Sequence, residues 1–453
     1  MNRSSLSLVI FFAACTATPP PATIPDGTIG APADMTSIAA GAQWDPAQGF
    51  VVHEWGTDTI VVGSDGVVQR GLHHEEEDLP AFVYDRMKNG LLAPYTSVQV
   101  KMETPVLYFY SATPLAAQVA VDFPAGVMTQ WYPAVAQFFP MLGTLDFTPA
   151  DAGDPIMDLK FPFRSSLCRS DYPRHLANGT LDWGQVEVLA RDAIVNQPDA
   201  PLDRYQWARA REVAANGVRV ANVQGRESQD ERFLFYRGLG NFALPLTIED
   251  LGAGKGVRLS NSDTRAVGPV FLVRVDAAGG AFVAHPEGLQ PGAALIDATQ
   301  LTSAPIDKYV DDLSAAMVNA LDSTGLYHDE AQAMVATWSR QWFRTPGTRV
   351  LYLASQPWTE GQLPLHVTPA PVSTVRVMMI RTEIITPDEE QLDSAALAGY
   401  PTDPAMGRAW FVGLGRFGEP RLRNAVRHAN DPAWAQPLVD ELAGVDTRVA
   451  AGE

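Results

Sequence analysis

The stretch FVVHEWGTDTIVV, residues 50–62, leads into the turn residues GSDG and then into GVVQRGL, residues 66–72. Valine, isoleucine and threonine favour extended backbone, and Gly, Ser and Asp between two such runs favour a tight turn. We therefore expect a strand over the first run and a β-hairpin over the whole stretch. Because His53 and Glu54 interrupt an otherwise apolar strand, they are costly to bury unless they have partners.

Strand-like runs continue from this hairpin to about residue 300. In SVQVKM, residues 97–102, apolar and polar residues alternate, as in a strand with one buried face. The other runs are VLYFYS (106–111), QVAVDF (118–123), VMTQWYP (127–133), ERFLFYR (231–237), PVFLVRV (269–275) and AFVAH (281–285). Short strands with frequent turns are typical of antiparallel sheets, so the sequence predicts a β-sandwich-like region.

The apolar period changes to that of a helix over residues 306–343. In GLYHDEAQAMVATWSRQWF, residues 325–343, apolar residues recur at helical spacing, which predicts a helical hairpin with Gly325 in its turn. Strand character returns in TRVLYLA (348–354) and TVRVMMIRTEII (374–385), and Thr386 is placed to cap a further helix.

The predicted fold class is α+β. A mainly antiparallel, β-sandwich-like N-terminal region precedes the helical hairpin, further strands and a helical tail. We expect a β-rich domain over residues 46–300 and a mixed helical and strand region over residues 301–453.

The first fourteen residues predict an export signal, because one arginine precedes a short apolar run. FAAC, residues 12–15, resembles the lipobox of bacterial lipoproteins, although Phe12 replaces the usual leucine. We therefore expect Cys15 to be lipidated, and residues 15–45, rich in Pro, Ala and Thr, to form a tether. This predicts an exported protein that is attached to the bacterial outer membrane or cell surface only through its lipid. Cys168 is then left without a disulfide partner in the chain.

The net charge of -19 limits the class of partner. An acidic surface repels the phosphate backbone, so we expect no nucleic-acid partner. The same surface attracts cations.

GLHHEEEDLPAF, residues 71–82, is the strongest candidate for a site. His73, His74, Glu77 and Asp78 combine imidazole nitrogen with carboxylate oxygen, and both helical and extended backbone bring members of this set together. Such ligands suit a divalent metal ion, with zinc the best match. The competing interpretation is a solvated acidic surface.

His53 and Glu54 are candidate partners for the same metal ion, and the alternative for His53 is a core histidine bonded to backbone. Glu103 either pairs with Lys101 or faces the same site. If the protein is an enzyme, we expect metal-assisted hydrolysis, with Glu75 or Glu76 as the catalytic base. Whether it is an enzyme stays open, since H-E-x-x-H and G-x-S-x-G are both absent.

The strings FVVHEWGT, HEEEDLPAFVY, KMETPVLYFYS and GLYHDEAQAMVATWSRQWF resemble those of a group of exported bacterial proteins of unknown function. That resemblance implies export and supplies no activity or catalytic residues. The alternative hypothesis is a non-catalytic envelope protein that binds a glycan, a peptide or a protein partner. Exposed aromatic side chains such as Trp131, Tyr132 and Trp183 would then form its binding surface.

Overall fold

The computed structural model describes residues 42–74, 79–85, 98–139, 177–221 and 227–444. Residues 40–453 form one compact unit. None of the helices in the described ranges is long and apolar enough to cross a bilayer. Cys15, Cys168 and all of the predicted tether except residues 42–45 lie outside the described residues.

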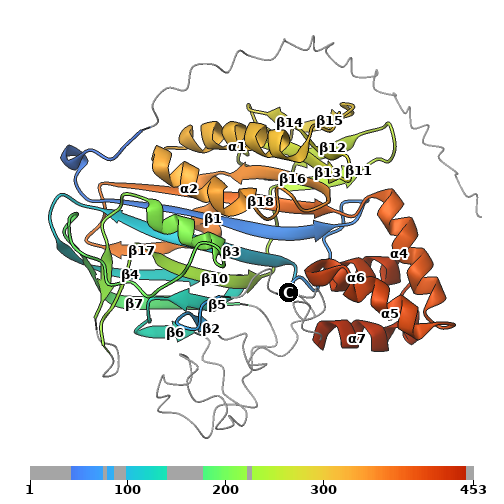
Figure 1. The fold of residues 1–453 in the computed structure, drawn as a ribbon, viewed down its shortest axis with the longest axis horizontal. Coiled ribbons are helices and arrows are strands. Elements are labelled where there is room, and N and C mark those ends of the chain that lie inside the picture. The colour runs from blue at the N-terminus through green and yellow to red at the C-terminus, as the bar shows by residue number, and fades with distance from the viewer. Residues whose placement is uncertain (1–41, 75–78, 86–97, 140–176, 222–226, 445–453) are drawn as a thin grey trace, which may run out of the picture. The chain divides into compact units, whose positions relative to one another are not determined.

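The largest element of the fold is a nine-stranded sheet with β1 (Val51–Val62) near its centre (Figure 1). β1 runs parallel to β18 (Ser373–Ile384) and antiparallel to β3 (Val100–Tyr110). In spatial order the remaining strands are β14 (Gly279–His285), β13 (Val270–Asp276) and β16 (Gly347–Ala354) beside β18, and β10 (Leu234–Gly240), β5 (Gly126–Tyr132) and β2 (Tyr84–Asp85) beside β3.

Two smaller sheets complete the strands. The six-stranded sheet contains β17 (Leu365–Thr368), β4 (Leu115–Phe123), β7 (Gly179–Val188), β8 (Val218–Val220) and β9 (Gln229–Glu231), and β6 (Gln137–Phe139) pairs with β7. The three-stranded sheet contains β11 (Leu246–Asp250), β12 (Val257–Asn261) and β15 (Ala294–Asp297).

The two faces of the nine-stranded sheet are covered differently. His53 points to one face and bonds Glu330 of α2 (His328–Ser339), which forms a helical hairpin with α1 (Ile306–Asp322). The next residue, Glu54, points to the other face and bonds Tyr236. Trp183 of β7 packs on Tyr236, so the six-stranded sheet covers this second face. The predicted α+β class and the sandwich of sheets are confirmed.

The helical tail follows β18 and has a small apolar core of its own. Its helices are α4 (Pro387–Gly399), α5 (Pro404–Val412), α6 (Gly418–His428) and α7 (Gln436–Gly444), while α3 (Gln356–Gln362) lies between β16 and β17. Thr386 caps α4 as predicted, because its hydroxyl accepts a hydrogen bond from the Glu389 amide.

Two predictions about connectivity need correction. β13 and β14 precede residue 300, yet β13 pairs with β16, so a boundary at 300/301 falls within one sheet. The hairpin after β1 is limited to its turn and to one bridge between Val62 and Val68. β1 instead pairs along its length with β3 on one edge and with β18 on the other. A strand that is buried throughout needs a partner at each edge for its backbone hydrogen bonds.

Candidate metal centre

Two adjacent histidines converge in the fold with one glutamate that is far from them in the sequence. His73 and His74 follow the turn after β1, and Glu419 lies in the first turn of α6. Nδ1 of His73 is 3.6 Å from Oε2 of Glu419, and Nε2 of His74 is 3.9 Å from the same oxygen. One ligand atom from each residue lies within 4.8 Å of the other two, so this group could hold a metal ion.

The backbone around the histidines is fixed by specific contacts. Gly71 has a φ of +96°, and a Cβ atom built there would lie 2.5 Å from Cδ of Glu419. Only glycine both adopts this conformation readily and leaves room for the carboxylate. Lys101 of β3 donates from Nζ to the carbonyl of His74 at 2.8 Å and to that of His73 at 3.3 Å. The segment is thereby tied to the nine-stranded sheet.

A further contact sets the orientation of the His73 ring. Nε2 of His73 lies 3.2 Å from the carbonyl oxygen of Ala443 in α7. Because a carbonyl oxygen can only accept, Nε2 carries the ring hydrogen and donates this hydrogen bond. Nδ1 is then unprotonated in the neutral ring and faces Glu419. A ring held by one nitrogen while the other is directed at a metal is the usual arrangement for ligating histidines.

The separations suit metal ligands better than hydrogen bonds. Both histidine-to-glutamate distances exceed those of normal hydrogen bonds, which end near about 3.2 Å for N–H···O. Zinc bonds of about 2.0–2.2 Å in a tetrahedron place ligand atoms about 3.3–3.5 Å apart. Among the described residues, Nδ1 of His73 and Oε2 of Glu419 have no hydrogen-bond partner although both are buried. Buried polar atoms of this kind require an explanation.

Burial dominates the electrostatics of the group. It raises the pKa of Glu419 to about 7, and the bonds from Arg423 to Oε1 offset only part of this effect. Burial, together with the charges of Lys101 and Arg423, lowers the pKa of His73 to about 4. The imidazole is therefore in its ligating, neutral form at neutral pH. Lys101 and Arg423 oppose an added cation, so the carboxylate charge of Glu419 is needed to hold one.

The other predicted ligands are either outside the described residues or in other contacts. Glu77 and Asp78 lie outside the described residues, as do Glu75 and Glu76, the two candidates for the catalytic base. His53 and Glu54 are not part of the group of His73, His74 and Glu419.

His53 instead bonds Glu330 through Nδ1 at 2.7 Å, and the same carboxylate accepts a hydrogen bond from Tyr110. Glu54 is paired with Arg376, whose Nε lies 2.6 Å from Oε2. Adjacent strand residues point to opposite faces, so these two side chains cannot share one metal ion. The need of His53 and Glu54 for partners is met by other side chains.

Glu103 feels the charge of Lys101, as one of its two predicted roles requires, but its hydrogen bonds go to other residues. It bonds Arg416 and Thr59, while Lys101 donates to the carbonyls described above. Glu419 was not predicted as a ligand. It is a single glutamate in GRFGEPRLR, and no local spacing connects it to the histidines.

The aromatic residues of the alternative hypothesis are core residues. Trp131, Tyr132 and Trp183 are 0%, 5% and 1% exposed, so they form no exposed aromatic surface. Trp131 and Tyr132 belong to β5 of the nine-stranded sheet and Trp183 to β7 of the six-stranded sheet, and all three rings pack against other aromatic side chains.

Comparisons with known proteins add no assignment. No family model matches the chain, and no curated protein is significantly similar to it. The solved Mu homology domain of Fcho1 from Danio rerio, with a bound Eps15 peptide, matches 74% of this chain and 96% of its own at 8% identity. Its TM-score of 0.22 is too low to support an argument.

Proposed function

We propose that this protein binds one divalent metal ion through Nδ1 of His73, Nε2 of His74 and Oε2 of Glu419. The observation that carries the proposal is the convergence of these buried atoms at separations close to those of metal ligands. Two imidazoles and one carboxylate are a common protein ligand set for zinc, which makes zinc the expected ion.

A structural role is the first expectation for this ion. The side chains of His73, His74 and Glu419 are 8%, 11% and 0% exposed, as in a closed site. The ion would join the segment after β1 to α6, and His73 already contacts α7 through Ala443. Zinc that links distant segments contributes directly to folding.

Metal-assisted hydrolysis is the second candidate. Three protein ligands leave a fourth position for water, as in catalytic zinc sites, and zinc lowers the pKa of such a water. Glu75 and Glu76 follow His74 directly in the sequence, which makes either one the proposed base. This activity depends on water reaching the ion.

Export and lipid attachment at Cys15 belong to the same proposal. The supporting features are the apolar leader, the FAAC string and the composition of residues 15–45. Replacement of Cys15 by serine should move the protein from the membrane fraction to the soluble fraction. Unchanged membrane association of that variant would contradict the anchor.

The metal proposal is tested by elemental mass spectrometry of the full chain, purified without metal-affinity chromatography. We expect close to one zinc per chain in the parent and loss of zinc in Glu419→Gln, which keeps the shape of the side chain. Glu103→Gln is the matched control, because Glu103 is partly buried beside an arginine but lies outside the group. Absence of metal from the parent, even after dialysis against zinc, would overturn the proposal.

A second measurement separates the two roles of the ion. A structural ion raises the unfolding temperature when it binds, whether or not any substrate is hydrolysed. A catalytic ion also supports hydrolysis of ester, amide or phosphoester substrates that Glu75→Gln or Glu76→Gln reduces while zinc content stays the same. Stabilisation by zinc without hydrolysis would assign the structural role alone.

A further inference from the structure

A cavity of about 380 Å³ lies between the three-stranded sheet, the ends of β13 and β16, and the first turn of α4. This volume is within the range of small-molecule sites, about 300–1,000 Å³. None of the three proposed metal ligands lines the cavity. It is therefore a separate candidate site.

The three-stranded sheet places two carboxylates on the wall of this cavity. Asp250 of β11 lies opposite Val257 of β12, and Val257 lies opposite Asp297 of β15. Residues that lie opposite each other point to the same face of a sheet, so the two carboxylates flank the side chain of Val257. Two strand spacings of about 4.8 Å separate their backbones by about 10 Å.

Apolar side chains form the surface between the charged groups. The larger ones are Val257, Leu272, Val275, Leu301 and Pro387. The first three are buried in the folded chain. A ligand that reaches from one carboxylate to the other therefore needs a hydrocarbon segment between two polar ends.

The wall of the cavity is negatively charged. Its acidic residues are Asp250, Asp276, Asp297, Asp388 and Glu389, and within the described ranges Arg274 is the only arginine or lysine that lines it. Nε of Arg274 lies 3.9 Å from Asp276, and Nη1 of Arg421 donates to Glu389 at 2.9 Å. Asp388 lies in the first turn of α4, where the helix dipole offsets part of its charge.

Asp250 and Asp297 have no arginine or lysine partner in the part of the chain that the structure describes. Asp250 accepts a hydrogen bond from the Gly252 amide at 2.9 Å. Asp297 accepts one from the Thr299 amide at 2.8 Å, and its other oxygen lies 2.9 Å from Nε2 of His285. Burial raises the pKa of Asp297, but the contacts with Thr299 and His285 outweigh this effect and lower it. A carboxylate has about four acceptor positions, so both groups can accept further bonds.

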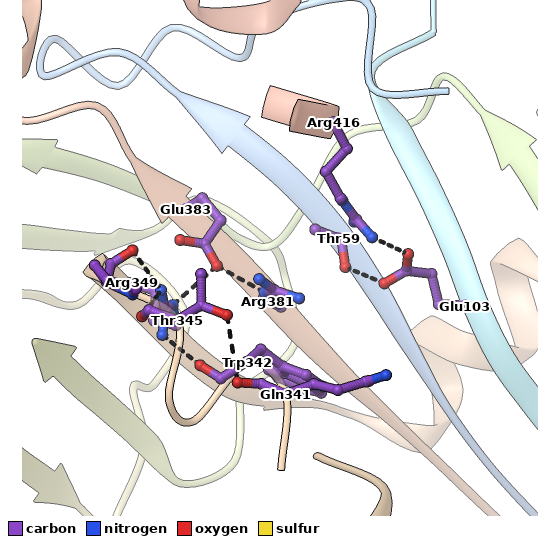
Figure 2. Close-up of polar contacts among 10 residues, drawn as sticks. Thr59, Glu103, Gln341, Trp342, Thr345, Arg349, Arg381, Glu383 and Arg416 are labelled. Carbon is purple, nitrogen blue, oxygen red and sulfur yellow. Dashed lines mark hydrogen bonds and ion pairs between the residues drawn. The ribbon is translucent and has the colours of Figure 1, made fainter. Parts of the chain in front are cut away.

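Cations of the neighbouring segments are used elsewhere. Figure 2 shows Arg349 and Arg381 directed at Glu383, to which their Nε atoms donate at 2.9 Å and 2.7 Å. Arg349 follows the lining residue Thr348 in β16, so it points to the opposite face of the sheet. Lys255 belongs to the loop between β11 and β12 but does not line the cavity.

The positions of the carboxylates favour an extended cation over a metal ion. Among the described residues, the only group of three or more potential ligands close enough to share an ion is that of His73, His74 and Glu419. Carboxylates on strands two apart suit two separate positive groups instead.

We propose that this cavity binds a linear aliphatic diamine or polyamine. One ammonium group pairs with Asp250 and a second with Asp297, while the hydrocarbon chain between them lies on Val257 and Leu272. This site does not depend on the proposed metal centre, because the two share no residue.

The test uses cadaverine as the probe and pentylamine as its match, since pentylamine has the same carbon chain but one ammonium group. Titration of the full chain at physiological salt is followed by calorimetry. We expect saturable binding of cadaverine at least about tenfold tighter than that of pentylamine, because the second ammonium makes charge-assisted hydrogen bonds. Asp250→Asn, which keeps the shape of the side chain, should weaken cadaverine binding by about tenfold and narrow the difference between the two amines.

Asp182→Asn is the matched control. Asp182 of β7 also accepts a hydrogen bond from the amide two residues on, at 2.7 Å, and does not line the cavity. The accepting turn is alike in both places, because Gly184 and Gly252 have φ angles of +67° and +88°. This variant should bind cadaverine like the parent.

Magnesium ions test for general attraction of cations to an acidic surface. Magnesium carries the same charge as cadaverine, and an equal concentration of it should leave cadaverine bound. Displacement by magnesium, equal binding of the two amines, absence of cadaverine binding to the folded parent, or equal effects of the two aspartate substitutions would each overturn the proposal.

Discussion

At the scale of single residues, Gly71 determines whether Glu419 can approach the histidines. Gly71→Ala places a methyl group 2.5 Å from Cδ of Glu419 and forces alanine to a φ of +96°. The strained backbone conformation of alanine should by itself lower the unfolding free energy by about 1–3 kcal/mol. Displacement of the Glu419 carboxylate should in addition weaken metal binding. Urea unfolding and zinc titration measure the two effects.

Gly254→Ala separates these contributions. Gly254 has a φ of +74°, but a Cβ atom there meets nothing within 4 Å. This control should lose stability through its backbone alone and keep the zinc affinity of the parent. If Gly71→Ala and Gly254→Ala behave alike in both measurements, the close approach of Gly71 to Glu419 has no role.

Glu103 gives a pH dependence whose sign follows from its surroundings. Its pKa is lowered from 4.5 to about 2, with Arg416 the largest favourable influence. Because the folded-state pKa lies below the unfolded value, the stabilisation is complete above pH 4.5 and is lost as the pH falls toward 2. Over this range Glu103 should reduce the unfolding free energy by up to about 1.4 kcal/mol per pH unit.

Glu103→Gln removes this titration and is the reference protein for the measurement. The parent should be more stable than the variant near pH 6, and the difference should shrink as the pH falls to about 3. Urea unfolding at several pH values measures it. A difference that does not change with pH would show that Glu103 is not held ionised by its neighbours.

At the scale of elements, the pairing of β1 with β18 includes a buried ion pair. Glu54 lies opposite Arg376 in register, and both are almost fully buried. Arg376→Met leaves the Glu54 carboxylate without its cation, which should cost about 3–5 kcal/mol. Adding Glu54→Leu should restore much of this loss, because two apolar side chains leave no uncompensated charge.

A double-mutant cycle on Glu54 and Arg376 measures this coupling. The matched cycle uses Arg258 and Glu249 of the three-stranded sheet, whose side chains are 41% and 31% exposed. That pair should couple by less than about 1 kcal/mol. Equal coupling in the two cycles would mean that burial does not strengthen the interaction.

The elements that the sequence predicts well are those with a local cause. Helical spacing predicts α1 and α2, with Gly325 at a φ of +98° between them, and Thr386 predicts the start of α4. The parallel pairing of β1 and β18 has no such signal. It joins strands separated by most of the chain, and both are buried along most of their length, so alternation of residue types does not reveal their partners.

At the scale of the whole molecule, the same limit applies to the candidate metal centre. His73 and His74 are adjacent, so their potential as ligands is visible in the sequence. Glu419 joins them only because the tail packs near β3, where Arg416 also bonds Glu103. The partners of His53 and Glu54 likewise come from α2, β10 and β18. Sequence identifies residues that need partners, whereas topology decides which partners they have.

Metal removal should therefore loosen the helical tail more than the sheets. The ion would join the segment after β1 to α6, while the tail has a separate, smaller apolar core. When the ion is removed, the ion pairs of Asp65 with Arg427 and of Glu103 with Arg416 still join the tail to the sheet region. We expect faster amide hydrogen exchange in α6 and α7 after chelation, with β1, β3 and β18 unchanged.

Glu419→Gln is the control for this experiment. The variant should show fast exchange in α6 and α7 with or without zinc, because it lacks the anionic ligand. Zinc should slow exchange in the parent. If the tail opens only in the metal-free form, a free zinc concentration 100 times the dissociation constant should slow it by about 100-fold. If chelation accelerates exchange equally in the tail and in β1, the ion stabilises the whole unit. If it accelerates neither, the three side chains do not form a structural metal centre.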